Sequence, residues 1–405
     1  MKKLLTLLLL LSLKAFSQID TLPSKSLTAN SIVSKPKWFE SISIRGYMQV
    51  RYNRLLETNP DLKCEQCDRS WGENGGIFIR RMRIIIYGQI HERVYFYIQP
   101  DFASAPSTNA QNFAQIRDAY VDIGLDKKNE YRIRLGQSKI PFGFENLQSS
   151  QNRLTLDRND ALNSALSNER DLAALFYWAP QKMRKLFASL VSEGFKGSGD
   201  YGIFGLGVYN GQTANRPELN NNLHVVARVT YPLQLGNQII EPSIQGYAGK
   251  FVMPTDQTSV GTKIVKDRNF KDERLAGSFT LYPKPFGIQA EFNVGRGPEF
   301  NTKTDSIELR KLSGGYATFS YMVKLKEQLL YPFVKIQTYS GGKKHELDAR
   351  SYDVNECEIG LEWQPFKNFE LVTMYIISKR RFEDFRNQQN IQKGSLLRLQ
   401  AQLNF

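Results

Sequence analysis

Apolar and polar residues alternate strictly along the last nine residues of the chain. The apolar positions are Leu397, Leu399, Ala401, Leu403 and Phe405, and a polar residue occupies every position between them. A β-strand directs successive side chains to opposite faces, so this alternation predicts a strand with one apolar and one polar face. Such a strand fits a membrane-spanning sheet and also a soluble sandwich, so the rest of the chain has to separate the two.

The same alternation recurs from residue 41 almost to the end of the chain. Near residue 133, for example, Tyr131, Ile133 and Leu135 oppose Arg132 and Arg134. We predict sixteen strands, at 41–53, 77–88, 92–102, 114–124, 130–138, 171–179, 201–210, 222–232, 238–250, 272–283, 287–296, 310–324, 329–340, 352–364, 369–380 and 394–405. The stretch 180–200 carries an apolar run and could be a further strand or the extension of one.

The connections between these strands alternate between short and long. The short ones are 89–91, 126–129, 233–237, 284–286, 325–328 and 365–368. The long ones are 54–76, 103–113, 139–170, 211–221, 251–271, 297–309, 341–351 and 381–393. Tight periplasmic turns and long external loops are typical of a bacterial transmembrane barrel, whereas a sandwich or propeller has no reason to sort its loops. We therefore predict an all-β fold, an antiparallel transmembrane β-barrel of sixteen strands, in which only 180–200 breaks the alternation.

The N-terminus has the pattern of a secretory signal peptide. Two lysines follow Met1, residues 4–13 are almost wholly apolar, and small residues precede Gln18. We predict a signal peptide at 1–17, a polar periplasmic leader at 18–40 and the barrel at 41–405. No later apolar run approaches the roughly 18–20 residues that a membrane helix needs, and the predicted location is the outer membrane of a Gram-negative bacterium.

Charge and cysteine content restrict the partners and the chemistry. The formal net charge is +14, and three lysines belong to the predicted signal peptide, so the remainder carries +11. Small anions and the anionic outer-membrane lipid surface are the expected partners, and nucleic acid is not. Cys64 and Cys67 are close enough in sequence for a loop disulfide in an oxidising compartment. The three histidines are scattered, so we expect no metal or other cofactor, and no catalytic motif predicts an enzyme.

Several motifs in the first half of the chain resemble the phosphate-selective porin O/P family. They are GYMQVRY at 46–52, IFIRRMRIIIYGQI at 77–90, YIQPDF at 97–102, RDAYVDI at 117–123, GQSKIPFGFE at 136–145 and NERDLA at 168–173. The terminal Phe405 is similar to the assembly signal of outer-membrane barrels. The resemblance implies a sixteen-stranded homotrimeric porin whose third external loop, here 139–170, folds into the lumen and narrows it.

Polar residues between lipid-facing apolar ones are expected to line the lumen. The arginines at these expected lumen-facing positions are Arg45, Arg51, Arg81, Arg83, Arg93, Arg132, Arg134 and Arg398. Because the last strand of a closed barrel pairs with the first, most of them would form one cationic arc that attracts anions. Asp118 and Asp122 lie among them, so the arginines could instead be paired with carboxylates that stiffen the wall, and both readings can hold together.

Within the third loop, Lys139, Arg153 and Arg158 are candidates for the constriction, although loop charges are by default merely solvated. The apolar stretch 140–144 is expected to anchor the loop to the wall. Arg80 breaks the alternation of its strand, and we expect it at the external rim, because a charge facing lipid at mid-bilayer would cost about 2–4 kcal/mol.

The sequence thus predicts a water-filled porin for passive diffusion of small anions, with phosphate or polyphosphate as the suspected solutes. Two alternatives remain open. The chain could be a general, non-selective porin, or a plugged structural or adhesion barrel that transports nothing.

Overall fold

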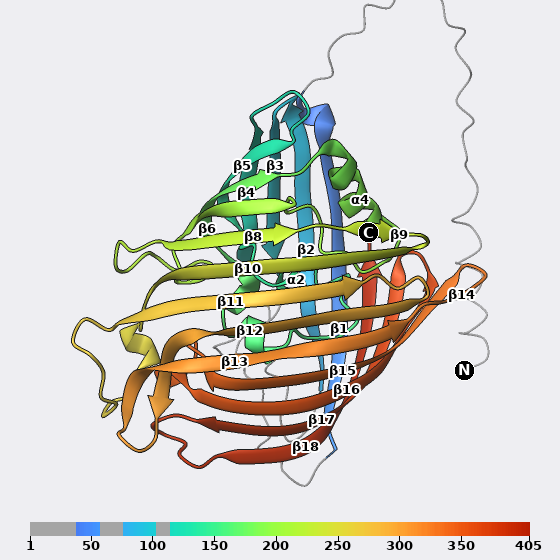
Figure 1. Ribbon diagram of the computed structural model, residues 1–405. Helices are drawn as coiled ribbons and strands as arrows, with labels where there is room; N and C mark the ends of the chain where they lie inside the picture. The colour runs from blue at the N-terminus through green and yellow to red at the C-terminus, as the bar shows by residue number, and fades with distance from the viewer. Residues whose placement is uncertain (1–37, 57–75, 103–113) are drawn as a thin grey trace, which may run out of the picture. The chain divides into compact units, whose positions relative to one another are not determined.

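The computed structural model describes residues 38–56, 76–102 and 114–405, and the strands of this part form one closed antiparallel sheet (Figure 1). The strands are β1 (Ile42–Leu55), β2 (Gly76–His91), β3 (Val94–Asp101), β4 (Gln115–Gly124), β5 (Tyr131–Lys139), β6 (Arg170–Trp178), β7 (Phe204–Tyr209), β8 (His224–Thr230), β9 (Leu233–Leu235), β10 (Gln238–Val252), β11 (Asn269–Leu281), β12 (Phe286–Asn301), β13 (Ser306–Tyr321), β14 (Val323–Leu325), β15 (Gln328–Gly342), β16 (Ser351–Phe366), β17 (Phe369–Glu383) and β18 (Ile391–Asn404).

The predicted count of sixteen wall strands is confirmed. β8 and β9 both pair with β10, and β13 and β14 both pair with β15, so each of these two pairs is one interrupted wall strand. β1 pairs with β18, from Tyr47 opposite Asn404 to Leu55 opposite Leu396, and this pairing closes the barrel. Beyond the last strand residue, the backbones of Gly46 and Phe405 exchange two hydrogen bonds of 2.7 and 3.0 Å.

Side-chain burial along the strands follows the predicted alternation with the polar side inward. In β18, Arg398 and Gln402 are buried while Leu399 and Leu403 are exposed on the outside. An apolar exterior and a polar interior are what a strand needs when lipid surrounds the sheet and protein or water fills it. No helix in the described ranges is both long and apolar enough to cross a membrane.

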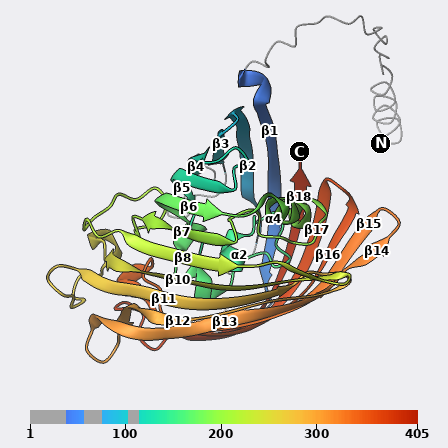
Figure 2. The same ribbon diagram turned by 45° about the horizontal axis from the view of Figure 1, so that its top comes forward.

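As predicted, the described connections are short turns at one end of the barrel and long loops at the other, with two exceptions. β12 and β13 extend further than expected, so the predicted long loop 297–309 is reduced to a turn at 302–305. The ambiguous stretch 180–200 forms neither a strand nor the extension of one: Gln181–Ser192 is the helix α4. Figures 1 and 2 both show α4 at the end of the barrel that carries the C-terminus and the β14–β15 hairpin.

Five short helical elements lie near the barrel wall or inside it, and a sixth precedes it. They are η1 (Trp38–Ser41), α2 (Phe144–Leu147), α3 (Asp160–Asn163), η2 (Ser167–Glu169), η3 (Thr255–Gln257) and η4 (Leu347–Ala349), of which η1 stands directly before β1. The predicted signal peptide, most of the predicted leader, and Cys64 and Cys67 lie outside the described residues. Those domain limits and the disulfide therefore stay predictions.

Candidate functional site: the lumen loop and its arginines

The connection between β5 and β6, residues 140–169, lies inside the barrel, and we call it the lumen loop. Its polar groups reach wall strands far around the ring. Asp157 contacts Arg51 of β1, Glu145 contacts Lys335 of β15, and the backbone at 144–145 contacts β12. Figure 1 shows α2, a part of this loop, enclosed by the strands. The predicted third loop therefore folds into the lumen.

An apolar cluster fixes the start of the lumen loop to the wall, as the sequence predicted for 140–144. Ile140 and Phe142 are completely buried, together with Tyr177, Tyr209 and Tyr247 of the wall. The ring of Phe142 meets that of Tyr247 edge-on, with 5.0 Å between centroids. Burying an aromatic side chain contributes about 1.5–3 kcal/mol relative to leaving it exposed. This cluster therefore anchors the start of the lumen loop to the wall.

Carboxylates hold the middle of the lumen loop. Glu291 of β12 accepts hydrogen bonds from the backbone N–H groups of Phe144 and Glu145, at 2.6 and 2.7 Å. The carboxylate of Glu145 in turn lies 3.0 Å from Nζ of Lys335 and accepts from the backbone of Asn159 at 2.7 Å. Burial alone would raise the pKa of Glu145, but Lys335, Arg153 and these hydrogen bonds lower it.

Asp157 is the point where the loop meets the cationic wall. Its Oδ2 lies 3.0 Å from Nη1 of Arg51 and is also ion-paired with Arg398, while its Oδ1 lies 3.5 Å from Arg80. Burial alone would raise the pKa of Asp157, but Arg51, Arg398 and Arg80 hold it well below its ordinary value. The predicted proximity of Arg398 to the first strand is confirmed.

The expectation for Arg80 was wrong. The pairing of β1 with β2 shifts between Gln49, which faces Arg81, and Val50, which faces Ile79. Arg80 is the extra residue of this β-bulge, and a bulge re-aims the side chain that it inserts. The guanidinium therefore turns into the lumen toward Asp157 and does not sit at the external rim.

Most of the predicted lumen arginines are paired with carboxylates. Arg83 lies 2.8 Å from Asp101, and Arg134 makes two hydrogen bonds to Asp122, at 2.7 and 2.8 Å. Arg132 lies 2.8 Å from Asp200, which belongs to the β6–β7 connection. Arg51 and Arg398 share Asp157, as described above. The pairing alternative thus accounts for five of the eight predicted arginines.

Two predicted arginines lie at the mouth of the barrel. Arg45 has the inward parity but is exposed, and its guanidinium stacks 5.3 Å from the centroid of Tyr87. Arg93 was expected in the third strand, but β3 begins at Val94, so Arg93 belongs to the exposed turn after β2. Only two residues, Glu92 and Arg93, join β2 to β3, so Arg93 forms part of the turn and does not pair with β2. The continuous arc therefore ends before Arg93.

Two of the three predicted loop cations also have partners. The ammonium of Lys139 donates to the carbonyls of Leu147 and Gln148, at 2.9 and 2.5 Å, so it braces the loop. Arg158 lies 3.1 Å from Glu169. Burial alone would raise the pKa of Glu169, but Arg158 and Arg170 hold it well below its ordinary value.

Arg81 and Arg153 are the buried arginines, among those singled out from the sequence, that have no carboxylate partner among the described residues. Arg81 is buried, and its hydrogen-bond acceptor is the amide oxygen of Gln49, at 2.8 Å, with no carboxylate within ion-pair distance among the described residues. Arg153 is 95 % buried, and its Nε and Nη1 have no hydrogen-bond partner in that part of the chain. The two guanidinium groups lie close enough to repel each other.

Asp160 is a second anchor of the lumen loop, and its partners were not predicted from the sequence. Asp160 is ion-paired with Lys343, from the loop after β15, and with Arg380 of β17, at 3.2 Å for the latter. Burial alone would raise the pKa of Asp160, but these two cations lower it. The inward parity of Arg380 in its strand was a signal that could have suggested it. Nothing in the sequence places Lys343 beside the third loop.

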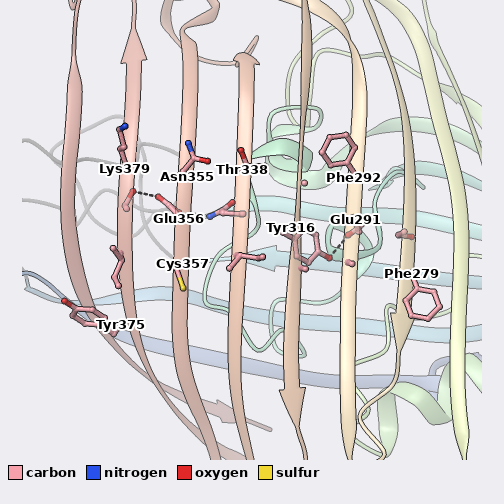
Figure 3. Close-up of a pocket in the computed structure, with 18 of the residues that line it drawn as sticks. Phe279, Glu291, Phe292, Tyr316, Thr338, Asn355, Glu356, Cys357, Tyr375 and Lys379 are labelled. Carbon is pink, nitrogen blue, oxygen red and sulfur yellow. Dashed lines mark hydrogen bonds between the residues drawn. The ribbon is translucent and has the colours of Figure 1, made fainter.

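The outside of the wall carries a shallow concavity of about 1270 Å³ over β10–β13 and β15–β18. Figure 3 shows Phe279, Phe292, Cys357, Tyr375 and Lys379 along it. These residues have the outward parity, whereas Glu291 and Tyr316, also labelled, hydrogen-bond on the inward side at 2.7 Å. The concavity thus belongs to the apolar exterior, and the charged site lies behind it.

A family model identifies the chain independently of this geometry. The model described as "Phosphate-selective porin O and P" matches residues 60–405. The chain belongs to this family. The porin is therefore an outer-membrane channel protein, and the resemblance suggested by its motifs is confirmed.

Three solved structures share the fold at low sequence identity. The outer membrane channel DcaP of Acinetobacter baumannii has 14% identity and a TM-score of 0.55, covering 90% of this chain and 97% of its own. The anion-selective porin from Comamonas acidovorans has 10% identity and a TM-score of 0.52, covering 90% and 99%. OmpT of Vibrio cholerae in a trimer form has 10% identity and a TM-score of 0.50, covering 90% and 99%. At these identities the likeness shows the fold of the porin.

Comparison with curated proteins finds no match for this porin. Among its described residues, no group of three or more His, Cys, Asp or Glu side chains is arranged to hold a metal ion. The site described above is an arrangement of fixed charges within the lumen.

Proposed function

We propose that the porin is an anion-preferring diffusion channel whose selectivity arises at Arg81 and Arg153. The supporting observation is the charge balance of one lumen cluster. Six arginines, which are Arg51, Arg80, Arg81, Arg83, Arg153 and Arg398, gather beside four carboxylates, Asp101, Asp157, Glu145 and Glu169. A surplus of fixed positive charge in a narrow, partly desolvated passage lowers the barrier for anions and raises it for cations.

Arg153 is the residue best placed to contact a passing anion. It belongs to the lumen loop and lines a small cavity between that loop and the wall, with Gln289 and Thr318 on the wall side. Nε and Nη1 of Arg153 are buried without hydrogen-bond partners among the described residues, which costs the free energy of their desolvation. An anion that accepts hydrogen bonds from them would offset this cost. Arg81 stands close by and supplies a second guanidinium.

Phosphate is the solute that we propose, on the chemistry of these two groups and on the family description. A guanidinium is planar and weakly hydrated, and its parallel N–H groups match two phosphate oxygens. Two guanidinium groups that repel each other would both gain from one multiply charged anion between them. Chloride offers a single charge and no bidentate geometry, so it should pass with weaker retention.

A general, non-selective porin is the second candidate, and the ion pairing of most lumen arginines supports it. If paired cations dominate the field, cations and anions should pass alike. A plugged barrel without transport is the remaining alternative, supported by the lumen loop and its many contacts.

The test is the reversal potential of the purified porin in a planar bilayer under a potassium chloride gradient. We expect anions to be preferred, and phosphate added at low concentration to reduce the chloride current. The double variant R81Q/R153Q should lose most of this preference and the phosphate block. R296Q, which removes an exposed outward charge, is the matched control and should retain both. Cation preference, or no current at all, would refute the proposal.

We also propose that the segment 1–17 directs export and that the porin assembles as a homotrimer. The supporting observations are the pattern of the N-terminus and the fold shared with OmpT in its trimer form. N-terminal sequencing of the protein purified from outer membranes should begin at Gln18. Mass measurement of the native protein in detergent should give three copies, and a single copy would contradict the trimer.

A further inference from the structure

The β6–β7 connection, residues 179–203, stands at the end of the barrel where every other described connection is a short turn. Its first part is α4, whose apolar residues Met183, Leu186, Phe187 and Leu190 follow the spacing of one helix face. Leu190 packs with Phe144 of the lumen loop and with Tyr282 of the turn after β11. The helix therefore folds over the periplasmic opening and touches the lumen loop.

The residues after α4, 193–199, continue across the lumen, and we call them the crossbar. On the near side, Asp200 anchors the chain to Arg132 of β5 and to Arg184 of α4, at 2.8 Å each. On the far side, the carbonyl of Gly194 accepts a hydrogen bond of 3.1 Å from Tyr331 of β15. Lys196 makes an ion pair of 2.5 Å with Glu362 of β16.

The positions of these anchors around the ring show that the crossbar spans the barrel. From β7 to β15 there are five wall strands in one direction, which are β8, β10, β11, β12 and β13 with their continuations. From β16 back to β6 there are seven, which are β17, β18 and β1 to β5. The crossbar thus joins nearly opposite sides of a ring of sixteen strands. A segment that ran along the rim would not reach both.

The crossbar also forms the floor of the cavity that Arg153 lines. The carbonyl of Lys196 accepts a hydrogen bond of 2.5 Å from the side chain of Gln148 in the lumen loop. Phe195 and Lys196 line this cavity together with Arg153 and Thr155 of the loop. Its free space is about 20 Å³, room for about one water molecule. A solute that passes Arg153 must therefore next pass the crossbar.

We infer that the crossbar is a second constriction, on the periplasmic side of the lumen loop, and that the Lys196–Glu362 pair is the latch that holds it across the lumen. This inference rests on the proposed channel function. Lys196 is a positioning residue here: it is buried and its ammonium is engaged by Glu362, so it sets the path of the crossbar. Gly194 and Lys196 both have positive φ, 81° and 63°, which lets the chain turn sharply between its two far-side contacts.

Two variants that change the charge in opposite directions distinguish a latch from a purely electrostatic effect of these residues on conductance. K196A removes a positive charge and E362Q removes a negative one, and both break the same ion pair. If the pair is a latch, both variants should raise single-channel conductance in a planar bilayer, by roughly twofold or more as the passage widens. K182A, on the exposed side of α4, is the matched control and should leave the conductance unchanged.

A charge swap tests the same idea in one protein. K196E/E362K places an ion pair of reversed polarity at the same two positions, so it should conduct like its parent, whereas K196A and E362Q should conduct more. The heat-modifiable gel shift confirms that all three variants are folded. Unchanged conductance in K196A and E362Q, or opposite changes in the two, would overturn the inference. The reversal potential of the parent tests the proposed anion preference separately.

Discussion

Asp157 of the lumen loop lies 3.0 Å from the guanidinium of Arg51, and through this contact the third loop is tied to the first strand of the barrel. The same carboxylate is shared with Arg398 of the last strand and with Arg80 of the bulge. One side chain therefore joins the lumen loop to both sides of the seam where β1 meets β18. Its loss would affect the loop and the closure of the barrel together.

Replacing Asp157 with Asn should destabilise the porin by about 3–5 kcal/mol, because buried arginines would lose their shared counter-charge. The measurement is the free energy of unfolding in urea with lipid vesicles present. D256N is the control: Asp256 pairs with Arg216 at the surface, where both side chains are about half exposed, and such pairs contribute about 0–1 kcal/mol. Equal effects of the two variants would contradict the role of Asp157.

The destabilisation by D157N should be the same at pH 5 and at pH 7. The folded-state pKa of Asp157 is held well below its ordinary value by Arg51, Arg398 and Arg80, against the effect of burial. A group with a lowered pKa contributes stability above its unfolded pKa, about 3.9, and loses it only as the pH falls through the folded value. Unfolding free energies of parent and variant at the two pH values check this, and a difference that changes between pH 7 and pH 5 would contradict the lowered folded-state pKa.

A side chain at Gly46 should impair closure of the barrel. A Cβ there would lie 2.5 Å from the carbonyl oxygen of Arg83 and 2.6 Å from the ring of Phe405. Overpacking of this kind costs about 1–3 kcal/mol, and more for larger residues. We expect G46V to assemble poorly, measured as the fraction of folded barrel on a heat-modifiable gel. G277A is the control, since a Cβ at Gly277 would lie 4.0 Å from the carbonyl oxygen of Ser243, and equal yields for both variants would contradict the prediction.

Cys357 provides a test of which side of the wall faces lipid. It has the outward parity in β16 and lies in the concavity of Figure 3. In a C64S/C67S background reconstituted into vesicles, a lipid-soluble maleimide should label Cys357 and a charged, water-soluble thiol reagent should not. A cysteine at Arg45, made with Cys357 replaced by serine, should react with the charged reagent. Reaction of Cys357 with the charged reagent would place it in water.

Strand content and orientation followed from the sequence because both rest on a local pattern. Leu399 and Leu403 alternate with Arg398 and Gln402, and a period of two leaves one choice of which face meets lipid. The alternation of loop lengths likewise predicted how the wall is ordered. Arg80 shows the limit of that reasoning, because a bulge changes the parity of a strand and depends on the pairing with β1.

The pairing of charges was decided only by the tertiary structure. The sequence offered Arg81 and Arg83 as lumen-lining candidates and Arg153 as a constriction candidate. Arg83 faces Asp101, while the other two have no carboxylate partner among the described residues. The path of residues 193–199 across the lumen is equally absent from the sequence, because the contact of Lys196 with Glu362 joins residues far apart in the chain. Local periodicity determines which side chains face inward, and only the folded barrel determines which of them neutralise one another.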